Sequence, residues 1–186
     1  MARGIRIGIL IAVLALIAAG IGLRVAMERP AEAQLVPGED VSIASLRGPL
    51  PPNAFVACPL HYCQVPGAAA SPVFPVAADG LYWRAVRLVT EAPRVAIIAD
   101  DPRQRRVVLI QRSAVFGFPD IVIAEIVPLG PSQSSLALYS RARYGRYDFG
   151  VNRARVEHWL ARLAAPAPQY NPPPSPPGRP AKPGGG

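Results

Sequence analysis

The sequence has few of the residues on which most enzymatic chemistry depends. Its 186 residues include only two histidines, His61 and His158. A hydrolytic triad needs a base beside its nucleophile, and two histidines leave little scope for one. No glycine-rich loop of the phosphate-binding kind occurs either. We therefore predict no catalytic residues and no cofactor, and we favour a protein that is not an enzyme.

Cysteine is just as scarce. Cys58 and Cys63 are the only two, and they flank His61 in the segment CPLHYC. A closed zinc site needs four ligands, and the second histidine lies far along the chain, so we predict no metal site. In an oxidising compartment, two cysteines at this spacing favour a disulfide. We predict that Cys58 and Cys63 are bridged; an incomplete metal site and free thiols are the alternatives.

Lysine is almost absent, although the chain is basic. Nineteen of the 20 basic residues are arginine, Lys182 is the exception, and the net charge is +8. The joint abundance of alanine, proline, glycine and arginine is typical of a genome of high G+C content. Nucleic-acid binding would need a basic face with interleaved aromatic residues in a recognisable motif, and the sequence has none. We predict no nucleic-acid partner.

One long uncharged run, Ile7–Leu23, stands near the N-terminus. With snorkelling of the flanking arginines it is long enough for a helix to cross a bilayer. A signal peptide cleaved at AEA (Ala31–Ala33) is the alternative, but the charged residues before that site disfavour cleavage. Arg3, Arg6 and the free amino terminus place the N-terminus in the cytoplasm by the positive-inside rule. We predict a single-pass inner-membrane protein whose domain lies on the periplasmic side.

Composition divides the chain into four segments. Residues 1–27 form the predicted membrane anchor, and residues 28–71, rich in proline and without clear periodicity, are predicted to form an extended arm. Residues 72–165 carry the helix and strand patterns of a small α+β domain. Residues 166–186 are mostly proline and glycine and cannot bury apolar area, so we expect a disordered tail.

The domain segment shows two helical patterns around four strand patterns. Apolar residues at helical spacing predict an amphipathic helix at Ala77–Glu91 and a closing helix that contains Val156, Leu160 and Leu163. The strand patterns are Arg94–Asp100, Arg105–Ser113, Asp120–Leu129 and Ser135–Arg143. Their short connections favour antiparallel neighbours. We predict an antiparallel sheet of about four strands, with helices before and after it that cover one face.

The last predicted strand has two faces. The first consists of Leu136, Leu138, Ser140 and Ala142, and the second consists of Ala137, Tyr139, Arg141 and Arg143. We expect the first face to meet the core and the second to face solvent, because antiparallel sheets commonly bury one side only.

Several stretches resemble a known bacterial family. The resemblance rests on QRSAVFGFPD (Gln111–Asp120), LALYSRARYG (Leu136–Gly145) and DFGVNRARVEHWL (Asp148–Leu160), which match in order and spacing the signature stretches of the domain of unknown function family 1499. It covers about Pro72 to Leu163 and leaves CPLHYC outside. The family carries no known activity, but its members often have N-terminal membrane segments. The motif positions are Arg112, Ser113, Phe116, Phe118, Pro119, Asp120, Ser140, Arg141, Gly145, Asp148, Gly150, Asn152 and Arg153.

Arginines gather at the strand ends and at the start of the closing helix: Arg112, Arg141, Arg143, Arg146, Arg153 and Arg155. The candidate site there consists of Arg112, Asp120, Arg141, Arg143, Asp148, Asn152 and Arg153. Such a cluster can fix a corner of the fold through arginine–carboxylate pairs. It can instead capture an anion beside the N-terminus of the helix. We expect Asp148 to cap the closing helix and to pair with Arg141, Arg143 or Arg153.

Together these patterns predict a membrane-anchored cell-envelope protein with a small domain that binds a ligand or partner. Candidate partners, besides the membrane, are an anionic small molecule, a lipid head-group or another envelope protein. An enzyme that uses the Arg/Asp corner on an anionic envelope substrate is one alternative, and a purely structural scaffold is another. A deep pocket lined by Arg141, Arg143 and Phe118 would favour ligand binding at the corner, whereas a fully paired corner would favour a structural role.

Overall fold

The computed structural model describes residues 2–27 and 39–165, and within the first range it describes the side chains of residues 7–20 and 22. The predicted tail, residues 166–186, lies outside the described residues. The first part of the predicted arm, residues 28–38, lies outside them as well.

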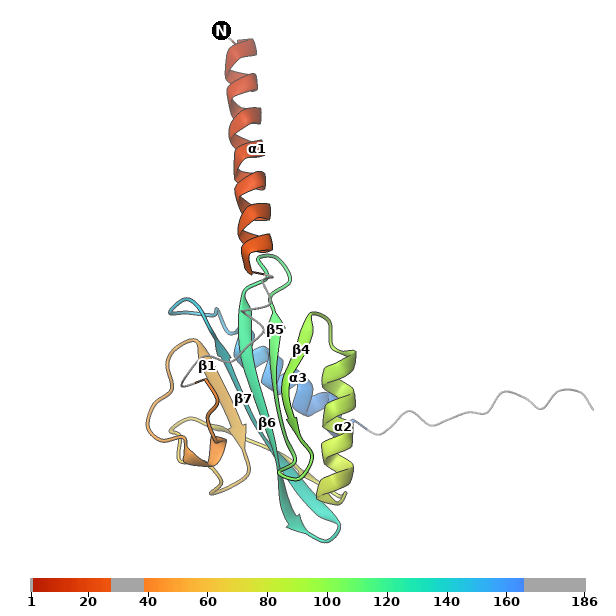
Figure 1. Ribbon diagram of the computed structural model, residues 1–186. Helices are drawn as coiled ribbons and strands as arrows, with labels where there is room; N and C mark the ends of the chain where they lie inside the picture. Colours follow the sequence, from red (N-terminus) through yellow and green to blue (C-terminus); the bar gives the residue numbers. More distant parts are fainter. Residues whose placement is uncertain (1, 28–38, 166–186) are drawn as a thin grey trace, which may run out of the picture.

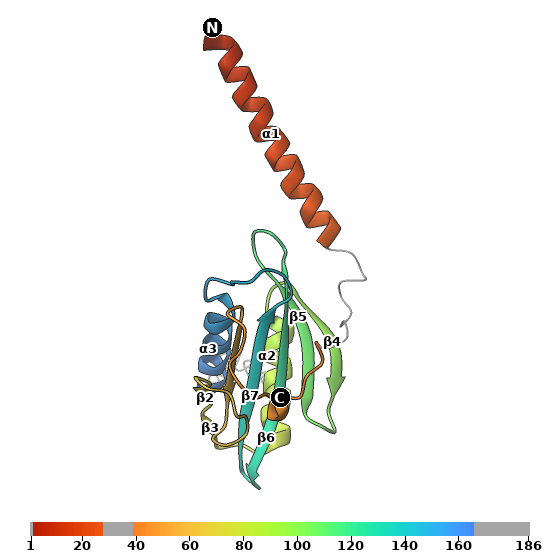
Figure 2. The same cartoon turned by 90° about the vertical axis from the view of Figure 1, so that its left-hand side faces the viewer.

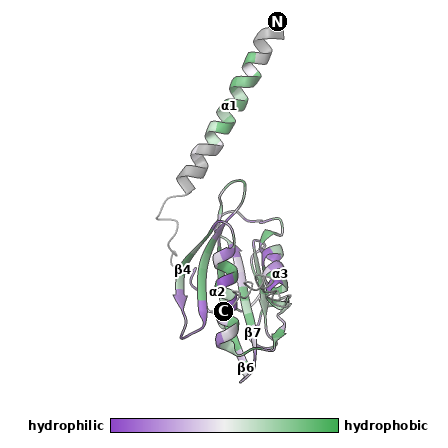
Figure 3. Cartoon of the chain, turned by 90° about the vertical axis from the view of Figure 1, so that its right-hand side faces the viewer, coloured by the Kyte–Doolittle hydropathy of each residue, from purple (hydrophilic) through white to green (hydrophobic). Residues whose placement is uncertain are grey.

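The N-terminal element is helix α1 (Ala2–Met27). Residues 7–20 and 22 are all exposed, and Figure 3 shows that this part of the helix is largely hydrophobic. Among the described residues, no helix has both the length and the hydropathy needed to cross a membrane. The membrane role of α1 stays a prediction.

A single mixed sheet forms the centre of the described domain (Figure 1). Six strands follow one another in the order β2-β1-β7-β6-β5-β4, and β3 pairs with β7 beside this series. Paired strands are antiparallel except β1 and β2, which are parallel. In chain order the strands are β1 (Ala54–Cys58), β2 (Ala69–Ala70), β3 (Val73–Phe74), β4 (Val95–Asp101), β5 (Arg106–Arg112), β6 (Pro119–Gly130) and β7 (Gln133–Ala142).

The four predicted strands are confirmed as β4 to β7, each within two residues of its predicted bounds. Their β-branched residues suit pleated backbone because the branched side chain packs well on its surface. Helices α2 (Ala78–Glu91) and α3 (Val151–Ala164) confirm the two predicted helices. Pro93 follows the end of α2, where its ring disfavours a further helical turn.

The sheet is larger than predicted because the segment predicted as an arm contributes to it. Strand β1 pairs along β7 from Ala54–Arg141 to Ala57–Leu138. The prediction of an extended arm is therefore wrong for β1, and the prediction of a purely antiparallel sheet is wrong for the β1–β2 pair. Prolines are abundant on either side of β1, but none lies within it, so they bound the strand without interrupting its ladder.

Helices α2 and α3 cover one face of the sheet. The core on this face includes Leu81 and Tyr82 from α2, Trp159 from α3, and Val122 and Leu138 from the strands. Figure 2 looks onto the opposite face, with α2 behind the sheet. The helical spacing of apolar residues explains this packing, since it places them on one stripe of each helix.

A second core lies on the opposite face, under residues 39–50 and 59–68, which flank β1 and which we call the cover. The cover contains the short 3-10 helix η2 (Ile43–Ser45). Its Ile43 and Val65 pack with sheet residues such as Ile123 and Tyr139. The prediction that Ala137 and Tyr139 face solvent is wrong: they are 0% and 5% exposed, because the cover lies over them.

Candidate functional site at one end of the sheet

Two carboxylates are buried on β6, and they face opposite sides of the sheet. Asp120 is 5% exposed and Glu125 is 6% exposed. They lie an odd number of residues apart, so the pleat directs them to opposite faces. Asp120 lies on the helix side, and Glu125 lies under the cover. Each is the centre of its own polar network.

Asp120 forms a buried ion pair with Arg155 of α3. The Nη2 atom of Arg155 lies 2.6 Å from Asp120 Oδ2, and both side chains are 7% exposed. The remaining guanidinium nitrogens are also used: Nε donates to Gln111 Oε1, and Nη1 donates to Ser140 Oγ and Asn152 Oδ1. The arginine thus ties three neighbouring strands to α3, in the rigid forked geometry that suits such a site.

Burial raises the pKa of Asp120, while Arg155 acts in the opposite direction and lowers it. Asp148 contributes a further, smaller rise in this pKa through charge repulsion. The surroundings of the pair therefore disfavour charged groups. Removing either partner would leave the other charge buried and uncompensated, which would lower the stability of the fold.

Asn152 connects this network to the loop between β7 and α3. Its Oδ1 accepts a hydrogen bond from Ser140 Oγ at 2.6 Å, and its Nδ2 donates to the backbone oxygen of Asn53 at 2.9 Å. Asn53 in turn donates from Nδ2 to the backbone oxygen of Gly145 at 2.6 Å. These side chains hold the loop to the start of β1, so the loop has a fixed position at the end of the sheet.

Asp148 accepts hydrogen bonds at the start of α3. Its Oδ2 receives the backbone N–H of Asn152 at 2.8 Å, and its Oδ1 receives that of Gly150 at 3.2 Å. It therefore accepts N–H groups at the start of the helix, as a cap would. The N-cap position itself is Gly150, two residues after Asp148. The predicted ion pair is wrong: within the described residues Asp148 pairs with none of the three predicted arginines, because the backbone occupies its oxygens.

Arg143 belongs to the other face of the sheet. Its guanidinium donates to both carboxylate oxygens of Glu39, at 2.7 and 2.6 Å, and the two side chains are only 6% and 11% exposed. This pair fixes the first described residue of the cover to the end of β7. Arg141 lies on the same face of β7 but is exposed.

The last two predicted arginines lie apart from Asp120. Arg112 donates from Nη1 to the backbone oxygen of Gly117, within the turn between β5 and β6. Arg153 projects from α3, stacks over the ring of Phe55 at 4.2 Å and lies 3.6 Å from Glu157. Of the seven predicted residues, the structure thus brings Asp120, Asp148 and Asn152 together, and it disperses Arg112, Arg141, Arg143 and Arg153.

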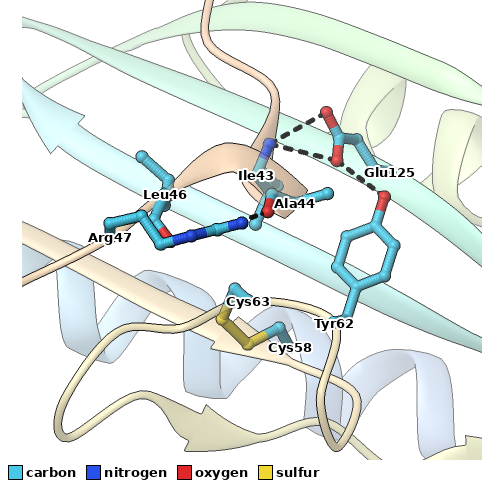
Figure 4. The surroundings of a disulfide bond; sticks show 8 residues. All are labelled: Ile43, Ala44, Leu46, Arg47, Cys58, Tyr62, Cys63 and Glu125. Carbon is cyan, nitrogen blue, oxygen red and sulfur yellow. Dashed lines mark hydrogen bonds between the residues drawn. A yellow bond between two sulfur atoms is a disulfide. The ribbon is translucent and has the colours of Figure 1, made fainter.

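Glu125 organises the cover on the opposite face (Figure 4). Both of its oxygens lie 3.2 Å from the backbone N of Ile43, and Oε2 accepts the hydroxyl of Tyr62 at 2.9 Å. Arg106 donates from Nε to Oε1 at 3.2 Å and also binds Asp40. Burial, followed by the charge of Glu125, raises the pKa of Tyr62, so this hydroxyl stays a donor.

A disulfide joins Cys58 to Cys63 beside this network, as the sequence predicts (Figure 4). It closes the loop that carries Tyr62 and thereby holds this side chain over Glu125. Within the part of the chain that the structure describes, no group of three or more His, Cys, Asp or Glu residues could hold a metal ion.

Two loops project from the end of the sheet near Asp120, and both expose large apolar side chains. One loop, residues 113–118, joins β5 to β6, and the other, residues 143–150, joins β7 to α3 (Figures 1 and 2). Phe149 is 98% exposed and has a φ of 55°, a conformation unusual for a bulky residue. We call the exposed set the aromatic rim; it consists of Val115, Phe116, Tyr144, Tyr147, Phe149 and Val151.

A family model described as "Protein of unknown function (DUF1499)" matches residues 52–163, more than half of the chain. The chain belongs to this family. The DUF1499 match begins before Pro72 and takes in β1 and the disulfide loop, so the placement of CPLHYC outside the family pattern is wrong. The match thus includes the strands of the described sheet, α2 and all but the last residue of α3, and it leaves α1 and η2 outside.

Other comparisons add little. A search of curated proteins gives no match. A solution NMR structure of a protein from Thermobifida fusca is 10% identical, covers 55% of this chain and 79% of its own, and has a TM-score of 0.34, which is too low to support an argument.

Sequence reasoning counted Arg155 among the arginines near this corner but left it out of the candidate site, although it is the centre of the network. One signal was present, since Arg155 follows Asn152 by three residues and shares its helix face. Glu39 had no comparable signal, because its partner Arg143 lies more than 100 residues away in sequence.

Proposed function

We propose that this protein is a non-enzymatic cell-envelope protein, anchored in the inner membrane by α1, whose periplasmic domain binds a partner through the aromatic rim. The observation that carries the proposal is a contrast at one end of the sheet. The polar groups around Arg155 are buried and paired with one another, whereas the neighbouring loops expose large apolar side chains.

The geometry at Arg155 favours a structural role for the Arg/Asp corner. All three guanidinium nitrogens donate to groups of the domain itself, so an anion would have to displace Asp120 or Ser140. An enzyme that used this corner on an anionic substrate would need the same displacement. We therefore assign binding to the loops that the corner positions.

The membrane anchor is supported by the sequence and by the exposure of α1. The run Ile7–Leu23 has no charged residue, and the large apolar side chains described within it are each about half exposed or more. A helix that is apolar all round is stable only where water is excluded from it. The disulfide suits the periplasm, because disulfides persist in oxidising compartments.

Membrane fractionation of the full-length chain tests the anchor. We expect a chain that starts at Met1, stays in the membrane pellet after alkaline carbonate extraction, and carries its C-terminus in the periplasm by a reporter fusion. Leu14→Arg should release much of the protein, since a central charge costs about 3 kcal/mol of insertion free energy. Leu60→Arg, an exposed position in the domain, is the matched control. A mature chain that starts at Gln34 would overturn the anchor.

A further inference from the structure

We propose that the aromatic rim docks on the anionic surface of the bilayer that holds α1. This inference rests on the proposed membrane anchor and names the partner of the rim. It assigns the lipid interface, and not a second protein, as the surface that covers the six rim side chains.

The rim is a fixed surface built by neighbouring strands. Its two loops leave β5, β6 and β7 at the same end of the sheet, where Asp120 pairs with Ala142 and Arg112 pairs with Pro119. The first loop is closed by the bond from Ser113 N to the backbone oxygen of Phe118 at 2.9 Å. The second is held by Asn53 and Asp148, as described above. The backbone of both loops is therefore held in place at this end of the sheet.

The rim exposes apolar groups that the domain does not use for its own packing. Phe149 contributes almost no buried area in the domain, yet its backbone holds the left-handed conformation. Phe116 packs against Phe118 at 5.6 Å between ring centroids but remains 56% exposed. Tyr144 and Tyr147 have an apolar ring and a polar tip, which suits the boundary between water and acyl chains.

The charge around the rim is positive. Arg94, Arg141 and Arg146 are exposed at this end of the sheet, and Arg146 lies 5.8 Å from the ring of Tyr147. Among the residues that the structure describes, the acids near the rim have internal partners: Asp120 pairs with Arg155, Glu39 with Arg143, and Asp148 with backbone N–H groups. Exposed arginines beside apolar side chains fit anionic head-groups above an acyl boundary.

The domain is attached to α1 from this same end. Glu39, the first residue after residues 28–38, is held by its two bonds to Arg143, the residue that begins the second rim loop. A chain of this length spans at most about 40 Å when fully extended. The attachment point therefore lies at the rim end of the sheet, and the reach of the chain lets the rim meet the membrane.

Photo-crosslinking of the full-length protein in lipid vesicles tests this inference. A benzophenone analogue of phenylalanine replaces Phe116 or Phe149 in the rim, or Trp83 or Leu60 as controls, which are exposed on α2 and in the disulfide loop. The vesicles contain phosphatidylcholine alone or with one fifth phosphatidylglycerol. We expect lipid adducts at Phe116 and Phe149, several times more abundant with phosphatidylglycerol than without it, and few at Trp83 and Leu60.

Charge variants make the test sharper. Arg141→Gln with Arg146→Gln should lower the adduct yield several-fold, whereas Arg103→Gln, exposed in the turn between β4 and β5, should not. Flotation with the vesicles but equal, low yields at all four positions would overturn the inference and leave the anchor standing. Crosslinks between two protein chains in place of lipid adducts would also overturn it. Failure to float with the vesicles would overturn the anchor, and the docking with it.

Discussion

The two faces of the sheet are held in different ways. On the helix face, α2 and α3 bury a continuous apolar core, and the polar network of Asp120 and Arg155 lies at one end of it. On the other face, the cover has only the short helix η2 as regular structure, and it lies over a smaller core beside Glu125.

The difference shows what an irregular segment needs in order to cover a sheet. A helix satisfies most of its own backbone groups, so α2 and α3 pack along the sheet mainly through apolar contacts. The cover cannot do this, and Glu125 supplies acceptors for Ile43 N and Tyr62 while the disulfide closes its loop. On one face, the buried pair of Asp120 and Arg155 thus joins α3 to the end of the sheet. On the other face, buried Glu125 accepts hydrogen bonds that regular structure would otherwise satisfy.

The largest expected effect is on the helix face. Asp120→Ala leaves Arg155 buried without its counter-charge, so the free energy of unfolding should fall by about 3–5 kcal/mol. Chemical denaturation of the full chain, followed by circular dichroism, measures this. Asp79→Ala, an exposed carboxylate with an arginine partner, is the control and should change little. A loss below about 1 kcal/mol for Asp120→Ala would contradict the role assigned to this pair.

A smaller loss is expected on the cover face. Glu125→Ala removes the acceptor of Ile43 N and of Tyr62, which should lower the unfolding free energy by about 1.5–3 kcal/mol. Arg106 keeps Asp40 and the backbone oxygen of Val41, so it is not left unpaired as Arg155 would be. The same denaturation experiment compares the two variants. An effect equal to or larger than that of Asp120→Ala would show that the two faces do not differ in this way.

Removal of the disulfide should loosen the cover more than the helix face. Replacing Cys58 and Cys63 by alanine opens a loop of sequence separation 5, which in the chain-entropy model lowers stability by about 2 kcal/mol. Hydrogen exchange should speed up more at Ile43 and around Tyr62 than in α2, where only the loss of global stability acts. Equal acceleration on both faces would argue against a local role.

Substitutions at Asp148 distinguish a structural role at the start of α3 from anion capture at this corner. Asp148→Ala should lower stability by about 0.5–2 kcal/mol, and Asp148→Asn by less, since asparagine also caps helices well. Thermal melts of the two variants, with and without phosphate, measure this. If Asp148→Ala left the melting temperature unmoved and phosphate raised it, anion capture would replace the structural interpretation.

The smallest expected effect is on pH dependence. Burial raises the pKa of folded Asp120 above its unfolded value of about 4, so between these two pKa values the folded state holds more protons than the unfolded state. The free energy of unfolding should therefore fall as pH rises through this window. Asp120→Asn should remove that part of the slope, which a series of denaturation curves from pH 4 upward would detect. An unchanged slope would assign it to another group.

The sequence predicted the regular elements well because each carries a local period. Apolar spacing in α2 and the β-branched stretches of β4 to β7 depend only on residues close in sequence. The sequence analysis did not predict strand β1. The five residues of β1 lie between prolines, and they form a strand only by pairing with β7. The sequence analysis also failed for Ala137 and Tyr139, because alternation along a strand does not tell whether a distant segment covers the second face.

The sequence predicted only those parts of the candidate site that depend on residues close together in the chain. Asp148 stands two residues before the N-cap of α3, and its bonds to the first N–H groups of the helix follow from local spacing. The partner of Asp120 could not be predicted, because several arginines of similar context were available and only the packing of α3 on β6 selects Arg155.

The sequence by itself determined the uncharged N-terminal run and the α-β-β-β-β-α order. It also determined the pairing of the two cysteines and the family of the domain. Each of these follows from composition or from a pattern of residues close together in the sequence. Only the tertiary structure decided that the former arm covers a second core, that Arg143 binds Glu39 while Arg155 binds Asp120, and that six apolar side chains meet at one sheet end. Long-range contacts depend on how whole helices and strands pack against one another. A buried charge is stable only beside a suitable partner, and the periodicity of a short segment does not identify that partner.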